Sequence, residues 1–149
     1  MTICLVGSEM CIRDRFVSSA LLALPALRGR FADDELAILT FNADVLTSPA
    51  FAPSLGGFAG PVAGLAEESH LRQVIANDLP ALNRQRAEDE IVRLVDGVCA
   101  AGEVRALLLE CTNLPPYKQA LKARFDIEIF DILTLIGDMK ADIVDPAHL

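Results

Sequence analysis

The chain has 149 residues, and 52% of them are hydrophobic, which is enough apolar material for one domain with a substantial core. A net charge of −8 argues against a nucleic-acid-binding surface, where lysine and arginine would cluster. No apolar run approaches the roughly 20 residues of a membrane span. The four cysteines form no Cys-x-x-Cys pair and only two histidines are present, so we expect no metal site, reduced thiols and a cytoplasmic location.

Residues 1–15 differ from the rest of the chain. A short apolar run, Ile3 to Val6, is followed by Gly-Ser-Glu-Met-Cys-Ile-Arg-Asp-Arg, and the segment lacks the features of a signal peptide. It resembles the translated read-through of a sequencing adapter, so we expect a foreign leader in which Cys4 and Cys11 have no evolved role. A genuine first strand over the same apolar run is the alternative. Residues 16–149 are then interpreted as one partial α/β domain.

The next part of the chain predicts a helix and two strands. The leucines before residue 28 predict a helix that Pro25 shortens or kinks. Residues 36–41 are a candidate buried strand, and residues 62–65 are a shorter one. Between them, residues 49–61 are rich in glycine and proline and predict a loop. His70 follows the second strand and is interpreted as an ordinary side chain rather than an acid–base group.

The remaining segments complete an α/β pattern. An apolar stripe predicts a helix over 82–101, and two further strands are expected near 104–109 and 126–130. Asp131 is predicted to cap a last helix, with orientation of a site residue as the alternative. Strands alternating with helices predict three layers, in which helices cover both faces of a mostly parallel four-stranded sheet.

Cys111 lies where a buried strand is predicted to end and a helix to begin. The local sequence is Leu-Leu-Leu-Glu-Cys-Thr-Asn-Leu-Pro-Pro-Tyr, and the two prolines suit the first turn of a helix running to about Arg124. Open α/β sheets bind ligands in the crevice beyond such strand ends. Free N–H groups at the start of a helix make a thiol easier to ionise. The alternative is a packed, inert cysteine.

The run Leu-Leu-Glu-Cys-Thr-Asn-Leu-Pro-Pro-Tyr, with the later Ile-Phe-Asp-Ile-Leu-Thr-Leu-Ile, resembles the carboxyl-terminal half of the aspartate/glutamate racemase superfamily. The resemblance implies cofactor-independent chemistry in which one cysteine removes the proton beside a carboxylate and a second cysteine returns a proton from the opposite face. Cys111 matches the second of these cysteines. Thr112 and Asn113 match residues that hold the substrate carboxylate.

Two further substrate-binding candidates, Thr40 and Asn42, end a neighbouring strand and are expected to face the same crevice. The family's first cysteine is expected upstream of Phe16, and the context of Cys11 does not match it. We therefore predict a truncated racemase or epimerase, inactive as given, that acts on an amino acid or another small carboxylate without a cofactor. The alternatives are an arylmalonate decarboxylase, a maleate isomerase-like enzyme or a non-catalytic α/β binding domain. A homodimer is also left open.

Overall fold

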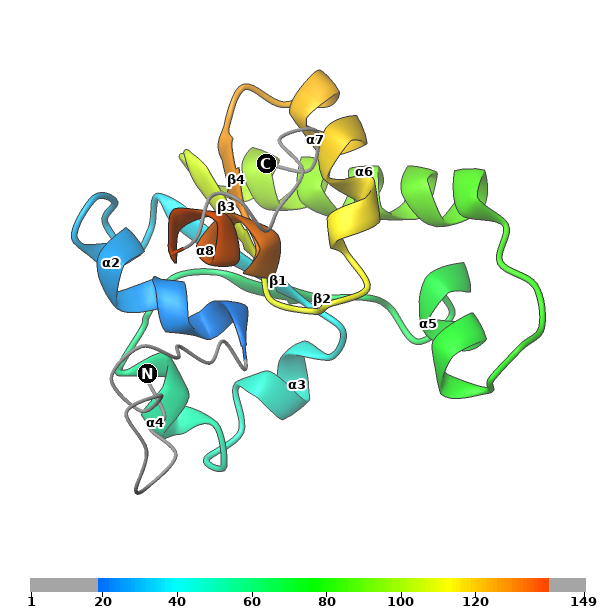
Figure 1. The fold of residues 1–149 in the computed structure, drawn as a ribbon, viewed down its shortest axis with the longest axis horizontal. Coiled ribbons are helices and arrows are strands. Elements are labelled where there is room, and N and C mark those ends of the chain that lie inside the picture. Colours follow the sequence, from blue (N-terminus) through cyan, green and yellow to red (C-terminus); the bar gives the residue numbers. More distant parts are fainter. Residues whose placement is uncertain (1–18, 140–149) are drawn as a thin grey trace.

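A four-stranded parallel sheet forms the centre of the computed structural model, which describes residues 19–139 (Figure 1). The order of the strands across the sheet is β2-β1-β3-β4, and all three pairings are parallel. The predicted α/β class and its four strands are therefore confirmed. The strands are β1 (Leu36–Thr40), β2 (Val62–Gly64), β3 (Ala106–Leu109) and β4 (Glu128–Phe130).

The two central strands are apolar along almost their whole length because both of their faces are covered. Every residue of β1 and β3 is buried, whereas the edge strands β2 and β4 are three residues each and partly exposed. Alternate side chains point to opposite faces of a strand, so these runs supply apolar groups to two layers. Ala37 and Leu39 lie in one buried cluster, and Leu36 and Ile38 lie in the other.

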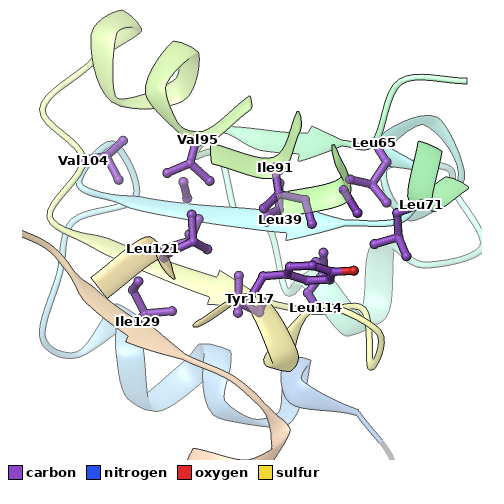
Figure 2. Close-up of a cluster of buried hydrophobic side chains, with 14 residues drawn as sticks. Leu39, Leu65, Leu71, Ile91, Val95, Val104, Leu114, Tyr117, Leu121 and Ile129 are labelled. Atoms are coloured by element: carbon purple, nitrogen blue, oxygen red, sulfur yellow. The ribbon is translucent and has the colours of Figure 1, made fainter. Parts of the chain in front are cut away.

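The larger cluster lies between the sheet and three helices (Figure 2). Leu71, Ile91 and Leu121 reach it from α5, α6 and α7 in turn, and Tyr117 adds its ring from the turn before α7. The elements on this face are α5 (His70–Ala76), α6 (Arg84–Ala101), the 3-10 turn η2 (Pro115–Tyr117) and α7 (Lys118–Arg124). The predicted helices over 82–101 and from Pro115 to about Arg124 are thus confirmed, the second as a proline-led turn that continues into a helix.

The opposite face is covered by shorter elements. Pro25 lies in the first turn of α2 and the helical segment is split there, since a 3-10 turn precedes a five-residue helix. The expected loop over 49–61 contains a short helix that was not predicted, because Pro53 is tolerated in a first helical turn. The elements are η1 (Ala20–Ala23), α2 (Leu24–Arg28), α3 (Ala43–Leu46), α4 (Ala52–Leu55) and α8 (Ile132–Met139).

Asp131 caps α8, as one of its two interpretations predicted. Its Oδ1 accepts a hydrogen bond from the Thr134 backbone N–H at 2.8 Å, and Thr134 Oγ1 accepts from the Asp131 N–H at 3.3 Å. This reciprocal pair resembles a capping box. The expected foreign leader at 1–15 and the alternative strand at Ile3–Val6 lie outside the described residues, and those expectations stay predictions.

Candidate active site

The carboxyl ends of β1 and β3 are tied together by side chains and backbone. Thr40 Oγ1 donates to Glu110 Oε2 at 2.7 Å, and the Glu110 N–H donates to the Leu39 carbonyl at 2.8 Å. Thr40 is 4% exposed and Glu110 is half-buried. These bonds hold the edge of the sheet beyond which a ligand crevice is expected in an α/β fold.

Cys111 comes directly after Glu110 and lies at this edge. Its side chain is half-buried and packs against the larger hydrophobic cluster. The Asn113 amide donates to Cys111 Sγ, with an Nδ2–Sγ distance of 3.8 Å, and the Leu114 N–H donates to the Cys111 carbonyl at 3.0 Å. The sulfur therefore lies in a turn that aims an N–H group at it, rather than deep among aliphatic side chains.

Thr112 and Asn113 are exposed and line two adjoining hollows. The first hollow has a volume of about 560 Å³, and Thr112 is one of its walls. The second has a volume of about 290 Å³ and takes in both Thr112 and Asn113. Arg84 and Pro116 line both hollows, and Arg84 Nη2 donates to the Pro116 carbonyl at 3.3 Å. Thr112 and Asn113, which follow Cys111 in the chain, thus border spaces that a small ligand could occupy.

The two candidates from the neighbouring strand already have structural partners. The Thr40 hydroxyl is buried and bonded to Glu110, while Asn42 Oδ1 accepts from the Val45 N–H at 3.2 Å and caps α3. Residues just after a strand often cap the next helix, which explains the position of Asn42. Substrate binding by Thr40 and Asn42 stays a prediction that these contacts do not favour.

Sequence reasoning missed a buried ion pair next to the first hollow. Lys118 and Asp131 are each 1% exposed, and Lys118 Nζ lies 3.4 Å from Asp131 Oδ2. Lys118 Nζ also donates to Thr134 Oγ1 at 2.7 Å. Burial lowers the pKa of the Lys118 ammonium, and the Asp131 carboxylate opposes that shift. In the sequence, nothing distinguishes Lys118 from Lys122, which is exposed on the same helix.

A second polar contact ties α5 to α6. Glu90 accepts hydrogen bonds from the His70 backbone N–H and from Arg86 Nε, and His70 Nε2 accepts from the Asn83 N–H at 2.8 Å. Burial would raise the pKa of Glu90, but the His70 N–H and then the Arg86 guanidinium lower it below its ordinary value. The His70 ring is thus bonded to the connection before α6.

Within the described residues 19–139, no three histidine, cysteine, aspartate or glutamate side chains gather closely enough to hold a metal ion. In the same part of the chain, no helix combines the length and the apolar character that crossing a membrane requires.

The chain is similar to several dimethylsulfoniopropionate lyases of Emiliania huxleyi strain CCMP1516. It is 38% identical to lyase 6 over 60 residues, which are 37% of this chain and 16% of that protein. The identity to lyase 5 is 31% over 132 residues, or 79% of this chain and 25% of the lyase. Lyase 7 is 33% identical over 93 residues, covering 53% of this chain and 27% of the lyase. This chain therefore spans only about a quarter or less of the length of these relatives. No protein-family model matches it.

These relatives overturn the predicted aspartate/glutamate racemase identity. The similar proteins are named lyases and no racemase model matches, so the isomerase function and the role in amino-acid metabolism are wrong. The physical reason is that a thiol at a strand-to-helix turn, even one that removes a proton, does not specify the fate of the carbanion. A carbanion beside a carboxylate gives racemisation if it is reprotonated and elimination if it expels a neighbouring group. The short motif around Cys111 carries no information on that second step.

Proposed function

We propose that this chain is part of a lyase that acts on dimethylsulfoniopropionate or a closely similar small carboxylate. Two facts support the proposal together: the 31% identity to lyase 5 over 132 residues, and the half-buried Cys111 at the carboxyl end of a central strand. The second is the observation that supports the mechanism, because α/β sheets bind ligands beyond the carboxyl ends of their strands.

The reaction needs one base on one face of the substrate. The Cys111 thiolate removes a proton from C2, the carbon next to the carboxylate. The electron pair of that C–H bond forms the C2–C3 double bond, and the C3–S bond breaks with its electrons on sulfur. The products are acrylate and neutral dimethyl sulfide, and the Cys111 thiol then loses its proton to water. No proton returns to carbon, so this reaction does not need the opposing cysteine that racemisation demands.

The neighbours of Cys111 have roles that fit this step. The Asn113 amide donates to Sγ and helps to hold the Cys111 side chain in the turn. As the C2 proton leaves, negative charge spreads onto the substrate carboxylate. Hydrogen-bond donors placed there lower the barrier because they act where charge develops. The exposed Thr112 hydroxyl lies next in sequence and is the donor that we assign to this oxygen.

The proposal is tested by the release of dimethyl sulfide, measured by headspace gas chromatography with dimethylsulfoniopropionate as substrate. Cys111→Ser should lower the rate by a factor on the order of 100 or more, since a positioned general base contributes about 10²–10⁴. Cys99→Ser is the matched control, because Cys99 is a free cysteine on α6. Release at the wild-type rate by folded Cys111→Ser, or no release by the folded wild-type chain, would refute the proposal.

Two further proposals concern the location of the protein and its oligomeric state. We propose a cytoplasmic location, which the free thiols of Cys99 and Cys111 support, since a reducing compartment keeps such groups unpaired. A homodimer is proposed as well, and light scattering after size-exclusion chromatography would show the mass of one chain if that is wrong.

A further inference from the structure

The hollow of about 560 Å³ beside Thr112 is lined by two cationic residues and by several apolar ones. Lys118 lines it from α7 and Arg84 from the start of α6, while Ile132 and Leu133 line it from α8. Its volume lies within the roughly 300–1,000 Å³ typical of small-molecule sites. A charged end and an apolar body together are what a short-chain carboxylate presents.

We infer that this hollow is the carboxylate subsite of the chain, with Lys118 and Arg84 as the cations that hold a three-carbon acid. The inference rests on the proposed function for the size of the acid, and it adds two binding residues that the sequence pattern did not indicate. It places the carboxylate beside the Thr112 hydroxyl, one residue from Cys111.

The surroundings of Lys118 favour a ligand over a purely structural role. Its ammonium has three N–H groups, and within the described residues its partners are Thr134 Oγ1 and Asp131 Oδ2. Lys118 is also one of the residues that line the hollow. A buried ion pair adds little net stability, since apolar residues of similar volume often serve as well. Stability alone therefore does not explain the buried charge of Lys118, and ligand binding would explain it.

Arg84 is the second cationic residue that lines this hollow. Its side chain is exposed, and its contact with the Pro116 carbonyl at 3.3 Å holds the guanidinium over the turn η2, at the border of both hollows. A guanidinium has five donors in a fixed fork and matches a carboxylate. The net charge of the chain is −8 and disfavours an anion, whereas Arg84 and Lys118 are positive at this hollow.

The test is a chemical-shift titration of the full chain with sodium propionate, followed at the Arg84 Nε–H and at the Thr112 and Lys118 amides. Sodium chloride at equal ionic strength corrects for salt. The wild type should show saturable shifts. Arg84→Gln should weaken the affinity for propionate about tenfold or more, the loss expected for a charge-assisted hydrogen bond. The double variant Lys118→Met/Asp131→Asn, which removes both charges of the buried pair, should weaken it by a similar factor. Arg84 is exposed, so that variant keeps the test valid if the double variant fails to fold.

Arg105→Gln is the matched control. Arg105 is exposed and paired with Glu35 at the amino-terminal ends of β1 and β3, away from the hollow. Replacing it should leave propionate binding unchanged. Wild-type protein without saturable shifts, or folded Arg84→Gln that binds propionate like the wild type, overturns the inference. The two proposals fail separately: dimethyl sulfide release without propionate binding at this hollow refutes the subsite alone. Propionate binding without dimethyl sulfide release refutes the lyase and keeps the subsite.

Discussion

Replacing Lys118 by methionine should destabilise the fold strongly, because Asp131 would remain buried without its cation. Both side chains are 1% exposed, and Lys118 Nζ lies 3.4 Å from Asp131 Oδ2, an oxygen that accepts no hydrogen bond from the described part of the chain. Leaving one charge of a buried pair unpartnered costs about 3–5 kcal/mol. The double variant Lys118→Met/Asp131→Asn removes both charges and keeps the Oδ1 acceptor that caps α8, so it should recover more than half of the loss.

The assay is thermal and urea unfolding followed by circular dichroism at 222 nm. For a chain of this size 1 kcal/mol corresponds to roughly 3–4 °C in Tm, so Lys118→Met should melt roughly 10–20 °C below the wild type. Lys122→Met, exposed on the same helix, should change stability by about 1 kcal/mol or less. A Lys118→Met variant within about 1 kcal/mol of the wild type would refute the argument, which takes the breaking of a buried pair to cost several times that. A double variant as unstable as the single one would show that the unpaired charge is not the cause.

Three further outcomes are expected from the structure. Burial, with Asp96 nearby, raises the pKa of the Cys99 thiol, so iodoacetamide should alkylate Cys99 more slowly at pH 8 than it alkylates a free cysteine; equal rates by mass spectrometry would contradict this. Glu90→Gln should lower the free energy of unfolding by about 1 kcal/mol at pH 7. Because the folded-state pKa of Glu90 lies below 4.5, that difference is complete above pH 4.5 and disappears as the pH falls through the folded-state value, and a pH-independent difference in urea titrations would count against it. Gly64→Ala should cost about 1–3 kcal/mol, since its Cβ would lie 2.5 Å from the Ala43 backbone nitrogen, whereas Gly97→Ala, on an open helix surface, should gain about 0.5–1 kcal/mol in the same unfolding assay.

Most of the secondary structure could be predicted because its causes are local. The apolar runs near 36–41 and 104–109 became the central strands, and the apolar stripe over 82–101 became α6. The predicted strands were one or two residues too long, because a strand extends only where it pairs with a neighbouring strand. For example, β4 pairs with β3 from Glu128 onward, although the apolar pattern begins earlier.

The place of the candidate residues in the fold could be predicted, whereas their part in binding and catalysis stays a prediction. Cys111, Thr112 and Asn113 lie at the carboxyl edge of the sheet as expected, because a strand-to-helix turn is encoded by adjacent residues. The reaction was wrong, since a turn of a few residues does not encode the fate of a carbanion. Thr40 bonds to Glu110, a partner 70 residues away that no local pattern specifies, whereas Asn42 caps the helix that follows it.

The sequence by itself determined which segments are strands and helices and where a thiol comes after a strand, because those features depend on periodicity and on neighbouring residues. Only the tertiary structure decided that Lys118 meets Asp131, that Arg84 reaches Pro116 and that Thr112 lies between two hollows. Those contacts join different elements of the fold. They depend on how α6, α7 and α8 pack at the edge of the sheet, and the same residues in another packing would be ordinary surface charges.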